Sequence, residues 1–342
     1  MATLTHDPAA AARTAGRANP AVTVGRRLLA FARRRRTPLT IVGSILVAAL
    51  LASLLAGRRD EFTAALSSAS AWMLAVTAAL QVVALLARSE AWHITIDAAG
   101  GAVGRRVLYR ASSMQVLGGV LNGHLGVAAR IAALRRSSPD VCPQVPTLVA
   151  AEFPILAVEA ALAALASFTL VVPLGLPWWS PLVAVAIIAS LSAGLRRLAL
   201  GRGRRLWQGL AVLRSLGGGS RVVGFVLIAV SAQILRNWLL LHAVGVDASL
   251  LDATAVLIAV VTLGQLPVGP SVGAAAAVLI LGSEGVAAAA AAGVLLTVTG
   301  TLGGLCFAAW AGGDQLWSAA SRARLNRVAL RRSRHGEAGA GP

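Results

Sequence analysis

The chain has 342 residues, of which 57% are hydrophobic and 13% are charged, and its mean hydropathy is +0.76. A soluble domain of this length needs less apolar content, and the continuous runs of Leu, Val and Ala differ from the alternating segments of a membrane β-barrel. The composition therefore excludes both classes. It predicts an all-α, polytopic transmembrane bundle whose spanning helices are each about 20 residues long.

All 31 basic residues are arginine, and the net charge is +18. Because the arginines flank apolar runs, the positive-inside rule and anionic headgroups account for them, and we expect a membrane partner and no nucleic acid. Cys142 and Cys306 lie far apart, and the sequence contains no zinc-binding H-E-x-x-H pattern and no Walker loop. We therefore expect no metal site, no cofactor and no enzymatic activity.

Taken in chain order, the sequence predicts three regions. Residues 1–37 form a basic tail that is expected to be disordered at an anionic surface, and they lack the apolar core of a cleavable signal peptide. Residues 38–317 form the membrane domain, and residues 318–342 form a second basic tail. Six apolar runs predict spanning helices, at 39–56, 64–87, 144–172, 182–195, 222–244 and 286–311.

The distribution of arginine between the predicted spans indicates their orientation. Residues 88–110 are expected to form a polar connection and 196–221 a basic loop. If the six runs cross and the remaining segments do not, 28 arginines fall on one side of the membrane and only Arg58 and Arg59 on the other. The positive-inside rule then predicts a multi-pass protein of the cell membrane with both termini in the cytoplasm.

The apolar run 253–282 is interrupted near its middle by GQLPVGPSVG, residues 264–273. Pro267 and Pro270 remove backbone donors, and Gly269 and Gly273 add flexibility, so the helix must break at membrane depth. Such backbone is tolerated only where protein or a watery cavity surrounds it. We expect a re-entrant segment beside a cavity; the alternative is a kinked helix or a loop between two short spans.

A second interrupted segment, 111–129, contains Asn122, His124 and Gly126 and has arginines on both flanks. A spanning helix should separate a basic side from a poorer one, so two basic flanks predict a segment that dips in and returns to the same side. Two re-entrant segments of opposite sense suggest an inverted repeat, an architecture in which transporters bind substrates near the bilayer midplane.

Polar side chains within the predicted spans are candidates for a substrate path, because charge at this depth is costly and is usually paired or faces water. Glu152 and Glu159 lie two helical turns apart on one face. Their depths predict that Glu159 meets Arg236 and that Glu152 lies closest to Arg130. Either a static ion pair or a path for a charged headgroup or proton fits this pattern. Gln233 and Asn237 share a helix face with Arg236.

Two further patterns allow more than one interpretation. The sequence GPSVG matches G-x-S-x-G, which would make Ser271 a nucleophile with His124 or His242 as its base, but the preceding run is helical rather than a strand and the glycines equally suit close helix packing. Trp92 and His93 follow the second predicted span. We expect an interfacial aromatic anchor there, with a headgroup contact as the alternative.

Three stretches together carry a family resemblance: LLARSEAWHITIDAAGG, LNGHLGVAARIAALRRSSPDVCPQVPTLVAAEF and LGQLPVGPSVGAAAAVLILGSEGVAAAAAAG. Their order and spacing, from about residue 38 to 315, resemble the transmembrane, flippase-type domain of lysylphosphatidylglycerol synthases. In this resemblance Gly126 and Arg130 match the first motif and Glu152 the second. The third motif is matched by Pro267, Gly269 and Gly273.

The chain departs from that family where LNGHLG lacks a proline, where Phe153 replaces a basic residue and where GPSVGAAAA lacks a glutamate. The resemblance implies translocation of an anionic phospholipid or a lipid-linked intermediate. Together with the depths of the polar side chains, it leads us to expect Arg130, Glu152, Glu159 and Arg236 to line the headgroup path, with the broken backbone at 267–273 at its centre. Because no stretch resembles an aminoacyl-transfer domain, synthesis of aminoacyl lipids is not implied. The alternatives are a membrane scaffold that partners a separately encoded glycosyl- or aminoacyl-transferase, and a hydrolase that uses Ser271.

Overall fold

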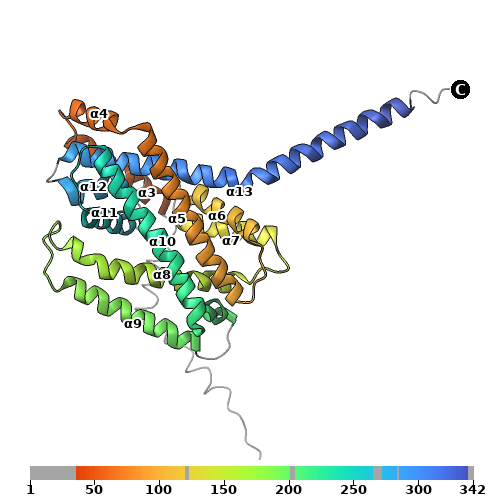
Figure 1. The fold of residues 1–342 in the computed structure, drawn as a ribbon, viewed down its shortest axis with the longest axis horizontal. Coiled ribbons are helices and arrows are strands. Elements are labelled where there is room, and N and C mark those ends of the chain that lie inside the picture. Colours follow the sequence, from red (N-terminus) through yellow and green to blue (C-terminus); the bar gives the residue numbers. More distant parts are fainter. Residues whose placement is uncertain (1–35, 120–122, 201–204, 265–271, 283–284, 338–342) are drawn as a thin grey trace, which may run out of the picture.

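A computed structural model of the chain describes residues 36–119, 123–200, 205–264, 272–282 and 285–337. Within these residues the structure is helical, which confirms the predicted fold class (Figure 1). The elements are α3 Arg36–Leu54, α4 Arg59–Ser68, α5 Ala71–Ala98, α6 Arg105–Gly119, α7 Gly123–Ser137, α8 Val145–Ala166, η1 Ser167–Leu170, α9 Ser180–Leu200, η2 Arg205–Arg214, α10 Leu216–Ala243, α11 Leu250–Leu263, α12 Val272–Leu281 and α13 Val286–Glu337.

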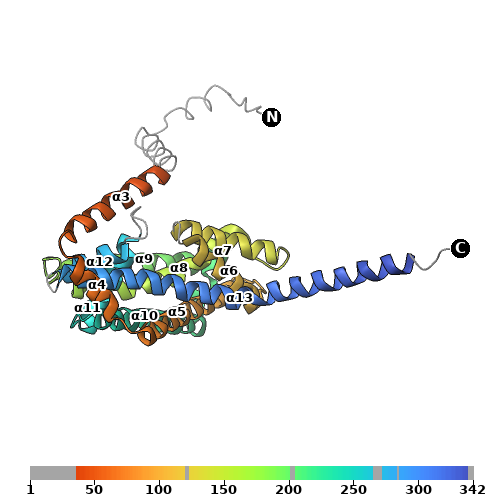
Figure 2. The same ribbon diagram turned by 90° about the horizontal axis from the view of Figure 1, so that it is seen from above.

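Five helices in the described part of the chain are long and apolar enough to cross a membrane: α5, α8 with η1, α9, α10 and the first 28 residues of α13. They correspond to five of the six predicted spans. The sixth run, 39–56, falls in α3, whose described apolar part, Ile45–Leu54, is shorter than a bilayer requires. Figure 2 shows α3 extending away from the packed helices, and Ile45, Leu46 and Leu50 are each about 60% exposed.

The second predicted span, 64–87, was placed too early in the chain. Residues 59–68 form the separate helix α4, and α5 begins at Ala71 after extended backbone at Ala69 and Ser70. At the other end α5 continues to Ala98 through residues assigned to a polar connection, because this stretch contains neither Gly nor Pro. The helix ends where Gly100 adopts a left-handed φ of 86°. Arg88 therefore lies within a spanning helix.

Two short helix pairs occupy the places of the two predicted re-entrant segments. Helices α6 and α7 pack along each other, as do α11 and α12. Asn122 lies in the first break, 120–122, and Pro267, Gly269, Pro270 and Ser271 lie in the second, 265–271; both breaks fall outside the described residues. Since each break joins two packed helices, each segment doubles back on itself, as the prediction requires.

Each helix pair is the centre of one hydrophobic cluster. One cluster joins α11 and α12 to α10 and α13, and the other joins α6 and α7 to α5, α8 and α10. The two pairs lie towards opposite ends of the bundle (Figure 1). Part of the element order also repeats: α5, the short pair α6 and α7, and α8 correspond to α10, the short pair α11 and α12, and α13. This order supports the inverted repeat, which stays a hypothesis.

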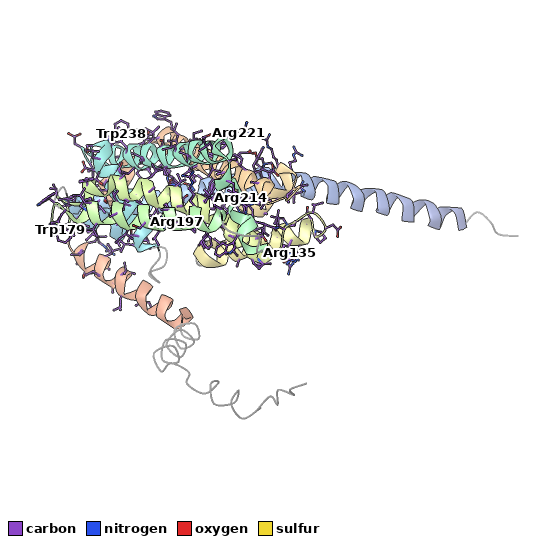
Figure 3. The ribbon with its side chains drawn as sticks, turned by 90° about the horizontal axis from the view of Figure 1, so that it is seen from below. Arg135, Trp179, Arg197, Arg214, Arg221 and Trp238 are labelled. Carbon is purple, nitrogen blue, oxygen red and sulfur yellow. The ribbon has the colours of Figure 1, made fainter. Side chains whose placement is uncertain are left out.

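The two ends of the bundle differ in their side chains. Trp179 and Trp238 lie towards one end, here the tryptophan end (Figure 3). Arg135, Arg214 and Arg221 lie towards the other, here the arginine-rich end (Figure 3). Tryptophan favours the membrane interface, and arginine favours the side with anionic headgroups. This polarity is the one that the sequence predicts; the assignment of the arginine-rich end to the cytoplasm stays a prediction.

Candidate functional site

Three side chains on one face of α5 each meet a charged residue from another helix. Gln81, Arg88 and Trp92 are separated by seven and four residues, a spacing that places side chains on the same face of an α-helix. Gln81 meets Arg236, Arg88 meets Glu159, and Trp92 meets Arg130. We call these contacts the polar series.

The contact nearest the arginine-rich end is a buried ion pair. Arg130 on α7 donates a hydrogen bond through Nη2 to Glu152 Oε1 on α8. The guanidinium carbon lies 3.8 Å from the centroid of the Trp92 ring, in cation–π geometry. Arg130 is 1% exposed and Glu152 6% exposed. The prediction that Glu152 lies closest to Arg130 is confirmed, and the pair ties the α6/α7 hairpin to α8.

The middle contact corrects the sequence prediction. Glu159, expected to meet Arg236, instead accepts a hydrogen bond from Arg88 Nη2 at 3.0 Å. The prediction was wrong because the second span was ended at Ala87, which placed Arg88 outside the helix. The two side chains are 36% and 27% exposed. This ion pair is therefore about one third exposed, although both residues lie near the middle of apolar spanning helices.

The third contact holds Arg236 of α10 without a carboxylate. Its Nη1 donates to Gln81 Oε1 and, at 3.1 Å, to Gln233 Oε1. Its Nη2 donates to the Leu296 carbonyl at 2.7 Å. The neighbouring Asn237 is also buried and donates to the Ala253 carbonyl at 3.5 Å. Gln233, Arg236 and Asn237 thus join α10 to α5, α11 and α13.

The sequence did not predict two members of the polar series, Gln81 and Arg88. Both lie in the run 71–98 at a spacing of seven residues, the same spacing that singled out the two glutamates of α8. This periodicity was the available signal. Trp92 was also misplaced: it is completely buried under Arg130, and is not an interfacial anchor.

The remaining candidates have simpler surroundings. Gly126 is buried within α7. Gly273 packs directly on α13, since a Cβ at this position would lie 2.7 Å from the Gly293 carbonyl oxygen. The side chain of His124 lies outside the described residues, as does Ser271. His242 packs against Trp238 with the two rings tilted by 51° and 4.5 Å between their centroids. His93 contacts the Val103 carbonyl oxygen at 3.2 Å.

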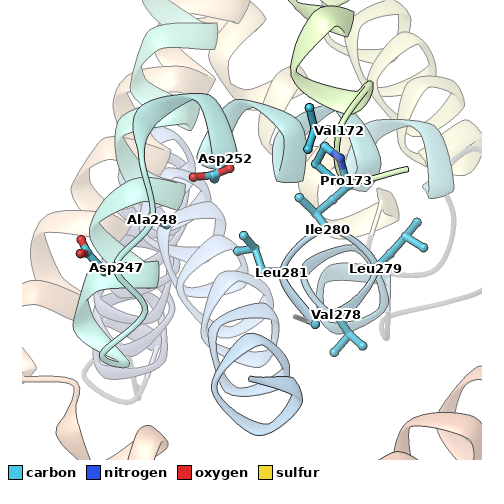
Figure 4. Close-up of a pocket in the computed structure, with 10 residues that line it drawn as sticks. Val172, Pro173, Asp247, Ala248, Asp252, Val278, Leu279, Ile280 and Leu281 are labelled. Atoms are coloured by element: carbon cyan, nitrogen blue, oxygen red, sulfur yellow. The ribbon is translucent and has the colours of Figure 1, made fainter. Parts of the chain in front are cut away.

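Two cavities lie at opposite ends of the bundle. A cavity of about 500 Å³ borders the turn after η1, the start of α11 and the end of α12, where Asp252 and Leu281 line it (Figure 4). A second, of about 320 Å³, borders the loop 138–144 and η2. Neither is lined by the five charged residues of the polar series, Arg88, Arg130, Glu152, Glu159 and Arg236. The cavity expected beside the second break cannot be placed, because residues 265–271 are not among those described.

Comparison of the chain with protein-family models, with curated proteins and with solved structures gives no match. The resemblance to the flippase-type domain of lysylphosphatidylglycerol synthases therefore stays a prediction from sequence.

Proposed function

We propose that the protein translocates an anionic lipid or a lipid-linked intermediate across the cell membrane, and that the headgroup binds at Arg88. The observation that carries the proposal is the partial exposure of the Arg88–Glu159 ion pair. Both side chains project from helices apolar enough to span a membrane, yet about a third of each is accessible.

An accessible ion pair at this depth needs a polar partner. A single arginine near the centre of a spanning helix costs about 2.5–3.5 kcal/mol on insertion scales. Hydrocarbon would offer Arg88 and Glu159 nothing to replace the lost water, whereas a lipid headgroup carries both a phosphate and polar groups. A phosphate can accept hydrogen bonds from the Arg88 guanidinium in place of the Glu159 carboxylate. The pair can therefore serve as an exchangeable headgroup site.

The position of the pair suits a path through the membrane. Gln81 and Trp92 are 11 residues apart on α5, which corresponds to about 16 Å of helix. The polar series thus covers about half of a hydrocarbon core that is ~30 Å thick. Arg88 lies between the buried Arg130 contact and the Arg236 contact. A headgroup at Arg88 would be intermediate between the two membrane surfaces.

Reconstitution of the purified full-length protein tests the proposal. Vesicles of phosphatidylcholine and phosphatidylglycerol would carry a trace of phosphatidylglycerol labelled with a fluorophore on its acyl chain near the headgroup. We expect dithionite to bleach more of this label than in protein-free vesicles, because labelled lipid from the inner leaflet reaches the outer one. Labelled phosphatidylcholine should exchange more slowly, because its phosphate is already balanced by choline.

Two variants separate the function from its rivals. Arg88→Gln should abolish the accelerated bleaching, while Arg221→Gln, at an exposed arginine of α10, should retain it. Bleaching no faster than in protein-free vesicles would contradict translocation by the isolated protein. If a transferase partner were then required for any lipid-linked activity, the scaffold function would replace the present proposal.

A further inference from the structure

We propose that Arg236 is the cationic centre of an anion-binding site inside the helix bundle, with a phosphate-type oxyanion as its ligand. The anion is either the phosphate of a lipid headgroup or free inorganic phosphate. The inference goes beyond the proposed translocation, since an anion can bind at Arg236 whether or not a lipid crosses the membrane.

The first support is the identity of the groups around Arg236. Its three hydrogen bonds go to neutral oxygens, those of Gln81, Gln233 and the Leu296 carbonyl. Within the described ranges no carboxylate is paired with it, whereas Arg88 and Arg130 each have a glutamate. Arg236 is nonetheless only 7% exposed. A buried charge without a counterion is unfavourable, so an external anion would complete the site.

The second support is an unused donor. Arginine has five N–H groups, and three hydrogen bonds are formed by the Nη atoms of Arg236. Its Nε is buried and has no acceptor among the described residues. A guanidinium with free donors binds the paired oxygens of phosphate or carboxylate with high directionality. The Nε atoms of Arg88 and Arg130 are also buried without an acceptor, but those two arginines have glutamate partners. At Arg236 the unused Nε–H coincides with the missing carboxylate, and the two features together favour an oxyanion as ligand.

The two glutamines provide a means of accommodating the ligand. A glutamine side chain can present either its oxygen or its NH₂ group to a neighbour. In the structure, Gln81 and Gln233 turn their oxygens to the guanidinium. When an oxyanion binds, rotation of either amide turns its NH₂ towards the anion, so the same residues stabilise both states.

The neighbouring helix leaves the guanidinium next to bare backbone. A Cβ built at Gly300 of α13 would lie 3.2 Å from Arg236 Nη2 and 3.7 Å from Cζ. A side chain at this position would crowd the edge of the guanidinium. Glycine therefore lets the guanidinium pack directly against the backbone of α13, which holds Arg236 in a fixed position between α10 and α13.

Thermal unfolding of the purified full-length protein in a neutral detergent, followed by tryptophan fluorescence, tests the site. The probes are inorganic phosphate at constant ionic strength and micelles that contain phosphatidylglycerol, with phosphatidylcholine micelles as the neutral control. We expect a saturable rise in the midpoint temperature with phosphatidylglycerol and none with phosphatidylcholine. A rise with inorganic phosphate as well would identify a site open to free anions. A rise with the lipid alone would identify the headgroup as the source.

Three variants make the test specific. The variants are made in an Arg88→Gln background, which lacks the proposed headgroup site; there Arg236→Gln should lose the saturable shift, and Arg221→Gln should keep it. Gln81→Glu supplies a resident carboxylate to Arg236, so it should raise the midpoint temperature without any probe and abolish the response to probes. If Arg236→Gln does not purify as folded protein, Gln81→Glu decides the question alone.

The proposal is overturned if neither anionic probe shifts the wild-type protein, or if Gln81→Glu responds like the wild type. These outcomes do not depend on lipid translocation: a protein that moves no lipid can still show the shift, and one that moves lipid can lack it.

Discussion

The two glutamates of α8 form ion pairs of the same chemical type in different environments. Glu152 meets Arg130 beneath the Trp92 ring and is almost fully buried. Glu159 lies two turns further along the same face, where it meets Arg88 and is 27% exposed. A closed pair fixes the position of the helices that carry it. An accessible pair can exchange one partner for a ligand. We therefore propose a structural role for the first pair and substrate binding for the second.

The difference in burial predicts a difference in energy. Removing one partner of a buried pair typically costs about 3–5 kcal/mol because the other charge stays buried and unpaired. Removing one partner of an exposed pair typically costs only about 0–1 kcal/mol. The following predictions test whether the two pairs of this protein follow that division.

The largest effect is expected for Glu152→Gln, which leaves Arg130 buried without a carboxylate. We expect a loss of about 3–5 kcal/mol in the free energy of unfolding, visible as a lower midpoint in denaturant or heat for the detergent-solubilised protein. Glu159→Gln is the matched control, with the same chemical change two turns away, and should cost about 0–1 kcal/mol. Equal losses in the two variants would remove the distinction between the pairs.

The next effect concerns the aromatic cover of the buried pair. Trp92→Leu removes the ring that faces the Arg130 guanidinium at 3.8 Å. The cation–π contribution at a desolvated site is about 2 kcal/mol, and the smaller side chain leaves a cavity that adds to the loss. Trp92→Phe retains a ring and should recover part of the stability. The same unfolding midpoints measure both variants, and no difference between Leu and Phe would argue against a cation–π contribution.

A smaller effect is expected at the accessible pair. Arg88→Gln should change the free energy of unfolding by only about 0–1 kcal/mol, because Glu159 can turn to solvent or headgroups. Size-exclusion elution and unfolding midpoint should both remain close to those of the wild type. A loss as large as that of Glu152→Gln would show that this pair is also structural.

The smallest effect is expected in the labelling rate of Cys142, which lies in the loop that follows α7. Burial raises the pKa of its thiol, so less reactive thiolate is present at neutral pH than for an ordinary cysteine, and maleimide labelling should be slow and rise with pH. In a Cys306→Ser background, Glu152→Gln should accelerate this labelling, because the loop loses the pair that holds α7 against α8. Glu159→Gln should leave the rate unchanged. An equal rate in both variants would contradict the role of the buried pair in fixing α7.

Part of this arrangement could be predicted from the sequence. The five long apolar runs identify the spanning helices, and the glycine, proline and arginine patterns around 111–129 and 253–282 predict two segments that double back. The proximity of Glu152 to Arg130 could be predicted from the depth of each residue in the membrane alone. These features depend on composition and length, which a single sequence provides.

The partner of Glu159 could not be predicted in the same way, because it depends on where α5 ends and on how α8 is rotated about its axis. Hydropathy falls at Arg88, but α5 continues to Ala98, because no Gly or Pro in this helix precedes the left-handed Gly100. Ending the span too early removed Arg88 from the membrane and left Arg236 as the apparent partner of Glu159. Since each residue turns a helix by about 100°, the facing partner also depends on how α8 packs. That rotation is fixed by tertiary contacts, which periodicity within one helix does not determine.

The central claim is that the Arg88 cation binds the headgroup while Glu159 occupies it in the absence of lipid. The most direct test compares Arg88→Gln with Glu159→Gln in vesicles that contain labelled phosphatidylglycerol. The predicted result is loss of exchange in Arg88→Gln and exchange at or above the wild-type rate in Glu159→Gln, with both proteins folded. Wild-type exchange in Arg88→Gln, or equal loss in both variants, would contradict the claim.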